Sequence, residues 1–232
     1  MPAPTRTAVL LYPGVTPLDF VGPAQFLSRL SHIDYVSLDR EAVPTDAGFG
    51  VMPTASIAEV VDADILCIPG GLNVVTVMDD DRLMDWVQSV GSRAKWVTSV
   101  CTGSLILGAA GLLRGYDATS HWAWRDHLEL FGATPADART VIDRNRITGG
   151  GVTAGVDFAL TLISQIWGRQ TAEVLQLALE YDPMPPLDSG SPARASTQTK
   201  GLHDHALEQI APERAERLIT AAARNAHRWD GS

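Results

Sequence analysis

Short apolar runs that alternate with helical segments are the feature that most constrains the fold of this chain. The expected strands are almost continuously apolar, and they lie at Arg6–Tyr12, Ile33–Leu38, Asp64–Ile68 and Trp96–Val100. Strands of this kind are typical of a parallel sheet that is covered by helices on both faces. The pattern therefore predicts an α/β fold with a doubly wound, mostly parallel sheet.

Apolar spacing and turn residues place the helices and a further strand pair. Helices are expected at Leu18–Leu30 (interrupted near Gly22-Pro23), Asp80–Arg93, the segment after Cys101, His121–Phe131, Thr153–Trp167 and Thr171–Glu180. A short strand pair is expected at Thr140–Asp143 and Arg146–Thr148. These elements complete the expected α/β domain.

The composition changes after Glu180. Residues Tyr181–Thr199 are rich in proline, glycine and serine, which predicts an extended arm, and two helices are expected after it, Leu202–Ile210 and Pro212–Arg228. Two helices are too few for a separate domain. We therefore divide the chain into an α/β domain over residues 1–200 and a helical tail over 201–232, which packs on the same body or on a partner subunit.

Size, charge and cysteine content narrow the class of protein. The chain has 232 residues, of which 45% are hydrophobic, which suits one large globular domain. A net charge of −9 argues against nucleic acid as the main partner. No apolar run is long enough to span a bilayer, and Met1–Thr7 lacks the pattern of a signal peptide. With only Cys67 and Cys101, a disulfide-stapled secreted fold is not expected, and we predict a cytoplasmic protein.

The segment Lys95–Ser104 places Cys101 where a strand turns sharply into a helix. A side chain on such a turn projects beyond the sheet, beside free N–H groups at the start of the helix. Those groups and the helix dipole favour a thiolate, so we expect Cys101 to be a nucleophile. The alternative, a small buried apolar residue, stays open for Cys101 and is the preferred interpretation for Cys67.

Other candidate residues also follow strands that end at this edge of the sheet. Asp19 is expected to carry a proton to or from the thiol, although it is equally suited to cap the helix that starts near Leu18. The N–H groups of Gly70, Gly71 and Thr102 are expected to stabilise negative charge, with an ordinary tight turn as the alternative for the glycines.

His121 is a further candidate as a base or hydrogen-bond partner, although a structural role at a helix start is favoured for it. No spacing of cysteine, histidine and carboxylate residues matches a metal site, and no Gly-x-Ser-x-Gly motif supports a serine nucleophile. The glycine-rich segment 149–155 lacks the lysine of a P-loop, so a flexible helix start near the nucleophile explains it better.

Five segments together resemble the ThiJ/PfpI superfamily, whose members have a glutamine-amidotransferase-like, flavodoxin-type fold. The segments are Leu-Tyr-Pro-Gly-Val-Thr-Pro-Leu-Asp-Phe-Val-Gly-Pro (11–23), Cys-Ile-Pro-Gly-Gly (67–71), Ser-Val-Cys-Thr-Gly-Ser (99–104), Thr-Ser-His-Trp (119–122) and Gly-Gly-Gly-Val-Thr-Ala-Gly-Val-Asp (149–157). Within this superfamily the chain looks most like the isocyanide hydratases, because of Asp19, Thr102 and the Glu180–Pro186 segment with its helical tail.

The resemblance implies an enzyme that adds water to a small isocyanide, such as cyclohexyl isocyanide, to give an N-substituted formamide. Cys101 would form a thioimidate, Asp19 would act as acid and base, and Thr102 would help to position water, with no metal or organic cofactor. Asp182 would reach the substrate or serve only as a loop cap. Relatives of this fold are usually homodimers, and the same is expected here.

Two other functions stay open. One is a redox sensor or ligand-binding protein that uses the same cysteine. The other is a branch of transcription regulators that continue into a helix-turn-helix domain. Because this chain ends at Ser232 and is acidic, we expect the enzyme rather than the regulator.

Overall fold

The structure is a computed structural model that describes residues 5–229. Its main sheet has seven strands in the order β10-β11-β7-β6-β1-β2-β5, and only β10 pairs antiparallel. Their bounds are Thr5–Leu10 (β1), Ser31–Ser37 (β2), Ala55–Ser56 (β5), Ile65–Ile68 (β6), Trp96–Val100 (β7), Thr140–Asp143 (β10) and Arg146–Gly149 (β11). The central order β2-β1-β6-β7-β11 is that of a flavodoxin-like fold, which confirms the predicted fold class.

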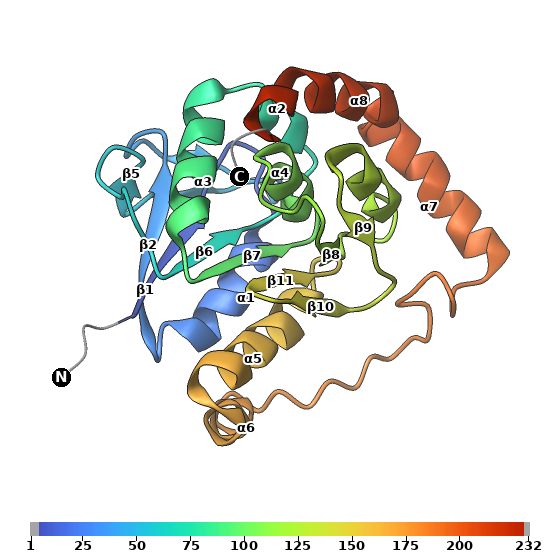
Figure 1. The fold of residues 1–232 in the computed structure, drawn as a ribbon. Coiled ribbons are helices and arrows are strands. Elements are labelled where there is room, and N and C mark those ends of the chain that lie inside the picture. The colour runs from blue at the N-terminus through green and yellow to red at the C-terminus, as the bar shows by residue number, and fades with distance from the viewer. Residues whose placement is uncertain (1–4, 230–232) are drawn as a thin grey trace.

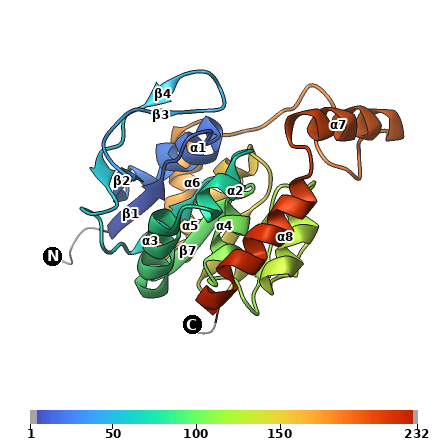
Figure 2. The same ribbon diagram turned by 90° about the horizontal axis from the view of Figure 1, so that it is seen from above.

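Helices cover both faces of the sheet (Figures 1 and 2). One face carries α1 (Pro17–Leu27) and α5 (Ala154–Trp167), which pack on each other, and α6 (Arg169–Ala178) packs against α5. The other face carries α2 (Val74–Met78), α3 (Asp81–Arg93) and α4 (Gly103–Ala109). Cys67 lies inside β6 and is fully covered, so core packing is its role, as predicted.

Several short elements were missed by the sequence analysis. They are the antiparallel pair β3 (Val43–Pro44) and β4 (Gly50–Val51), the parallel pair β8 (Asp117–Ala118) and β9 (Thr134–Pro135), strand β5 and helix α2. Each β-strand among them has two residues, and α2 has five. Elements this short cannot be detected from apolar periodicity, because a two-residue strand or a five-residue helix holds hardly more than one repeat of its apolar pattern.

The predicted interruption of the first helix is wrong. Helix α1 runs without a break through Gly22 and Pro23. Packing against α5 explains this, since Gly155 leaves room for the Pro23 ring: a methyl group on Gly155 would lie 3.2 Å from Pro23 Cδ. The contact compensates for the hydrogen bond that Pro23 cannot donate.

The helix predicted at His121–Phe131 forms only over its later part, and it is a 3₁₀-helix. The chain forms a turn at His121–Trp124, followed by the 3₁₀-helix η1 (Arg125–Phe131), and it leaves η1 through Gly132 with φ +74°. Trp124, Leu128 and Phe131 are buried beneath this segment. Their packing against the body outweighs the local preference for an α-helix.

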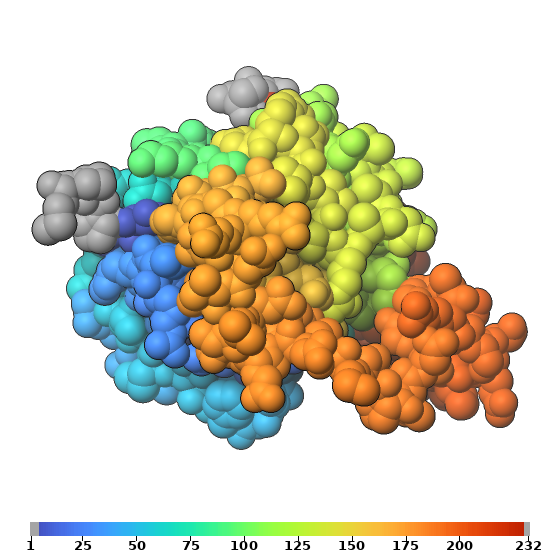
Figure 3. Space-filling view, turned by 90° about the horizontal axis from the view of Figure 1, so that it is seen from below, coloured from blue at the N-terminus to red at the C-terminus, as the bar shows by residue number. Residues whose placement is uncertain are grey.

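The tail differs from the prediction at both of its helices. Helix α7 spans Thr197–Ile210 and starts earlier than expected because Ser196 caps it, accepting a hydrogen bond from the Thr199 N–H at 3.1 Å. Helix α8 spans Arg214–Asn225 rather than starting at Pro212, and it is followed by η2 (Ala226–Trp229). The arm runs along the lower face and leads to α7, which projects from the body (Figure 3).

Helix α8 packs on the same chain, against α2, α4 and η1. Asn225 is buried and donates to Met78 O at 3.0 Å. The buried Arg228 side chain contacts Asp81 at 3.1 Å and also pairs with Asp85. These contacts fix the end of the tail to α2 and α3. Within residues 5–229, no helix has the length and apolarity needed to cross a membrane.

Candidate active site

Cys101 occupies the sharp turn between β7 and α4, as the sequence predicts. Its backbone has φ +58°, a left-handed conformation that is unfavourable for a residue with a side chain. The Cys101 N–H donates to the carbonyl groups of Gly149 (3.0 Å) and Gly150 (2.8 Å), which stabilises this conformation. Gly103 lets α4 approach β6, because a methyl group there would lie 2.0 Å from Ile68 O. The turn is therefore built for close packing around the thiol.

Asp19 lies in the first turn of α1 with its carboxyl group fully buried. Thr16 occupies the N-cap position, although its side chain makes no cap hydrogen bond, and Asp19 lies inside the helix with its carboxyl group turned to Gly70, so it is not the cap residue. Asp19 Oδ2 accepts a hydrogen bond from the Gly70 N–H at 2.9 Å, while Oδ1 has no partner. Burial raises the pKa of Asp19 to about 7, although the Gly70 N–H and the Cys101 thiol oppose the shift. Near neutral pH this carboxyl group can both take up and release a proton.

The Cys101 thiol is deeply buried, and this burial opposes the thiolate that the helix start was expected to favour. Only 5% of the residue is exposed. Burial raises the pKa of Cys101 far above its ordinary value, and the negative charge of Asp19 raises it further. The backbone N–H groups of Val152 and Thr102 favour the thiolate but do not outweigh these effects. A helix of seven residues contributes little dipole against a buried charge.

The glycine N–H groups are already used inside the protein, contrary to the expectation that they would face the substrate. Gly70 donates to Asp19, and the Gly71 N–H donates to Thr102 Oγ1 at 2.9 Å. The Thr102 hydroxyl donates in turn to Gly71 O at 2.8 Å, so its proton is not free for a water molecule. These bonds fix the Asp19 carboxyl group and the strand end beside Cys101. The N–H groups that face the sulfur are those of Val152 and Thr102 instead.

A cavity of about 240 Å³ lies beside Cys101. Its lining comes from the ends of strands, from the turn at His121 and from the tail: Thr16, Asp46, Gly71, Leu72, Cys101, Thr102, His121, Trp124, Val152, His203, Leu207 and Ile210. The volume lies below the range of about 300 to 1,000 Å³ that is typical of sites for drug-sized ligands. The thiol therefore faces a space suited to a small molecule.

His121 lines this cavity and is neutral at pH 7. Burial, with a smaller contribution from His203, lowers the pKa of His121 to about 4. Its Nδ1 accepts from the Ala123 N–H at 3.3 Å, which leaves the proton on Nε2. A neutral imidazole of this kind donates a hydrogen bond but is not a source of positive charge.

This arrangement of strands, turn and acid agrees with a family assignment. The family model for the DJ-1/PfpI family matches residues 5–165. The chain belongs to the DJ-1/PfpI family. The predicted resemblance to the ThiJ/PfpI superfamily is thereby confirmed.

Relatives within the DJ-1/PfpI family include proteins of similar length. An isonitrile hydratase from Pseudomonas putida is 44% identical over 220 residues, which cover 93% of this chain and 95% of that protein. The crystal structure of a ThiJ/PfpI family protein from Pseudomonas syringae has a TM-score of 0.89 and 41% identity, and the match covers 94% of this chain and 90% of that one. The transcriptional regulator GbdR of Pseudomonas aeruginosa is 30% identical over 63% of this chain but over only 40% of its own length.

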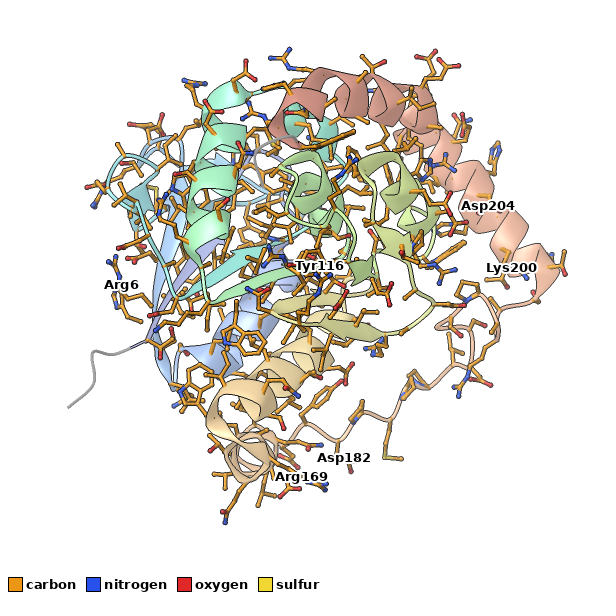
Figure 4. All side chains as sticks on the ribbon, in the orientation of Figure 1. Arg6, Tyr116, Arg169, Asp182, Lys200 and Asp204 are labelled. Atoms are coloured by element: carbon orange, nitrogen blue, oxygen red, sulfur yellow. The ribbon has the colours of Figure 1, made fainter. Side chains whose placement is uncertain are left out.

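Asp182 does not lie with the other predicted site residues of this DJ-1/PfpI protein. Its side chain is exposed on the arm beside α6 and points away from the body (Figure 4). It does not line the cavity beside Cys101. The structure thus brings Cys101, Asp19, Thr102, Gly70, Gly71 and His121 together and leaves Asp182 outside.

Several cavity residues were missed by the sequence analysis. Trp124 follows His121 and Val152 follows the glycines of segment 149–155, and only those neighbours were candidate residues. The tail residues His203, Leu207 and Ile210 belong to no recognisable motif. Their only signal is that they share one face of α7, at positions four and three residues apart.

A second hollow of about 350 Å³ shares His121 and Val152 with the first. Its two arginines are paired: Arg125 with Asp137, and Arg139 with Asp157. Their charges are therefore already neutralised, and the hollow does not favour an anion. Among the described residues, no three histidine, cysteine or acidic side chains are grouped as metal ligands would be.

Proposed function

We propose that this chain is an isocyanide hydratase, which adds water to R–N≡C and forms the N-substituted formamide R–NH–CHO. The near full-length similarity to the Pseudomonas putida isonitrile hydratase supports this activity. The observation in the site that carries the proposal is the buried Asp19 carboxyl group, which has an unpartnered oxygen and interacts with the Cys101 thiol beside a small cavity.

The first step uses both the sulfur and the proton of the thiol. Cys101 Sγ forms a bond to the terminal carbon of the isocyanide, and the thiol proton passes through Asp19 to the same carbon. The product is a thioimidate, R–N=CH–S–Cys101. A thiol beside a carboxyl group that can carry a proton suits this addition, because the carbon must gain a sulfur and a hydrogen together.

The second step adds water to the thioimidate carbon. The water oxygen bonds to that carbon while Asp19 accepts a proton from the water. Asp19 then passes this proton to the substrate nitrogen, which gives R–NH–CH(OH)–S–Cys101. The carbon–sulfur bond then breaks as the hydroxyl group loses its proton. Sulfur regains a proton through Asp19, so the formamide leaves and the thiol is restored.

A redox sensor is disfavoured by the state of the sulfur. Sensor cysteines are exposed and have a low pKa, because oxidants react with the thiolate. Cys101 is buried, and its pKa is raised. These two properties instead suit a thiol that reacts only with a molecule small enough to enter the cavity.

The test is a formamide assay with cyclohexyl isocyanide. The variant Cys101→Ala should have no measurable turnover, and Asp19→Asn should lose roughly a hundredfold, the range of a general acid–base group. Cys67→Ala is the matched control, since it removes the other cysteine from the core of β6 and should keep most of the rate. Turnover by Cys101→Ala close to that of the wild type would exclude the covalent scheme.

We propose further that the protein acts as a homodimer in the cytoplasm. Large apolar side chains that are exposed on α6 and on the arm support a subunit contact there: Val174, Leu177, Met184 and Leu187. Large apolar side chains exposed on neighbouring segments are a feature of surfaces that contact other proteins. A small-molecule substrate needs no further partner.

A further inference from the structure

The tail covers the cavity beside Cys101. Three side chains of α7 line this cavity, His203, Leu207 and Ile210, and we refer to them as the tail roof. Their spacing of four and three residues places them on one face of the helix. The thiol comes from the centre of the chain, whereas the tail roof comes from a segment about one hundred residues later.

Contacts with the body hold the tail roof in place. Leu207 is 5% exposed, and the adjoining Ala211 is buried as well. The His203 ring lies 4.6 Å from the Trp122 ring and 6.2 Å from the His121 ring, measured between centroids. On the C-terminal side, α8 fixes the chain to α2 and α3 through Asn225 and Arg228. These contacts hold the tail roof at His203 and Leu207, whereas Ile210 at its end is 61% exposed.

The cavity wall is apolar where a substrate side group would lie. An isocyanide is linear, so its N-substituent must point away from the sulfur when its terminal carbon reaches Cys101. The wall offers Leu72, Trp124, Val152, Leu207 and Ile210, and its one acidic residue, Asp46, is exposed and accepts a hydrogen bond from Thr16. A compact apolar substituent fits such a wall without leaving a buried charge or polar group unpaired.

We propose that Leu207 and Ile210 select the substrate of this site, admitting isocyanides with compact alkyl or cycloalkyl substituents and excluding bulkier ones. This proposal rests on the proposed function, because it names the substrate class of the same site. One methylene group in an apolar pocket changes relative rates by roughly 10- to 200-fold, so a change of one tail-roof side chain is measurable.

The test compares pairs of isocyanides in one reaction, because the ratio of their kcat/KM values does not depend on the fraction of folded enzyme. Leu207→Ala should raise the 1-adamantyl to cyclohexyl ratio by about 10-fold or more. Ile210→Trp should lower the cyclohexyl to ethyl ratio by a similar factor. Leu202→Ala, which truncates an exposed leucine of α7 outside the cavity, should leave both ratios unchanged.

A second readout needs no turnover. N-ethylmaleimide and N-cyclohexylmaleimide both alkylate thiols, and the mass of the Cys101 peptide reports each rate. Leu207→Ala should raise the relative rate of the cyclohexyl reagent, whereas Leu202→Ala should not. If the wild type hydrates no isocyanide but this selectivity shifts, the proposed function fails and the tail roof stands. Unchanged ratios in both assays, in Leu207→Ala and Ile210→Trp alike, would overturn the tail-roof proposal.

Discussion

The fold buries the Asp19 carboxyl group, which is unfavourable for its ionised form. Its burial raises the pKa from 3.8 to about 7, so the folded protein loses free energy when the group ionises. The Gly70 N–H, which bonds Oδ2, and the Cys101 thiol compensate only part of this cost. A carboxyl group used for structure alone would be paired on both oxygens. The cost is consistent with a group that is kept to move protons.

The pH dependence of stability tests this interpretation of Asp19. Between pH 4 and 7 the unfolded carboxyl group ionises while the folded one keeps its proton, so wild-type stability falls as pH rises and the loss is complete above about 7. Asp19→Asn removes this titration. We expect its unfolding free energy, relative to the wild type, to rise on the order of 4 kcal/mol from pH 4 to pH 7.5. Urea unfolding at several pH values measures this difference.

Asp182→Asn is the matched control, since it makes the same chemical change on an exposed carboxyl group of the arm. Its stability relative to the wild type should not change with pH in this way. An Asp19→Asn difference that stays constant across the range would contradict the buried, proton-holding carboxyl group.

The positions of individual site residues could be predicted from the sequence, whereas their ionisation could not. The position of Cys101 at a strand end, and of Asp19 after another strand, followed from topology alone. The ionisation state did not, because it depends on how deeply the two groups are buried. The direction of the Gly70 and Gly71 N–H groups also needed coordinates, since each is taken by a neighbour from another segment.

At the scale of elements, the turn from β7 into α4 depends on how closely two backbones approach. Gly103 permits this approach, because its Cα faces Ile68 O of β6. The first turn of α4 thereby lies against the strand that leads into Gly70. The thiol, the strand end and Asp19 keep their positions relative to one another because this contact is tight.

Gly103→Ala should therefore disturb the site more than an ordinary overpacked residue would. The added methyl group would lie 2.0 Å from a backbone oxygen, which must move with its strand. We expect a loss of about 3 kcal/mol or more in unfolding free energy, at or above the upper end of ordinary overpacking, and a fall in turnover of the remaining folded protein. Denaturant unfolding and the formamide assay measure the two effects.

Gly201→Ala provides the comparison, because nothing lies within 4 Å of the added methyl group and the residue is inside α7. It should stabilise the protein by about 0.5–1 kcal/mol through helix propensity. Equal stability effects for the two substitutions would argue against the tight approach at Gly103.

Prediction of elements succeeded where the pattern was long. Strand β7 and strand β10 were predicted at their observed bounds, and α3 and α5 within one residue. Strands of two residues gave too little pattern, and η1 followed the packing of Trp124, Leu128 and Phe131 rather than local preference. Tertiary contacts determine the conformation of such segments, and these contacts leave no periodic pattern in the sequence.

For the whole molecule, the tail is held by an ion pair whose two sides differ in exposure. The Arg228 side chain is 4% exposed, whereas those of Asp81 and Asp85 are 60% and 71% exposed. Removing the carboxylates would leave a buried positive charge unpaired, but removing the arginine would leave two solvated carboxylates. Loss of the two carboxylates should therefore destabilise the protein more than loss of the arginine.

This asymmetry predicts different losses in stability. The double variant Asp81→Ala/Asp85→Ala should lose about 1–3 kcal/mol, because it leaves most donors of the buried guanidinium group without a partner, although Asn225 still accepts from Arg228 Nε. Arg228→Met keeps the apolar part of the side chain and should lose less than about 1.5 kcal/mol. Denaturant unfolding measures both, and limited proteolysis in the arm detects release of the tail. A larger loss for Arg228→Met than for the double variant would contradict this account.

The position of the tail roof also has a consequence for synthesis. A ribosome adds about 5 to 20 residues per second, so Cys101 is made roughly 5 to 20 s before His203. During that interval the turn at Cys101 and the Asp19 side chain exist without the tail roof. The cavity beside the sulfur gains its α7 side only when translation reaches this helix, so any fragment that stops short of α7 lacks His203, Leu207 and Ile210 beside Cys101.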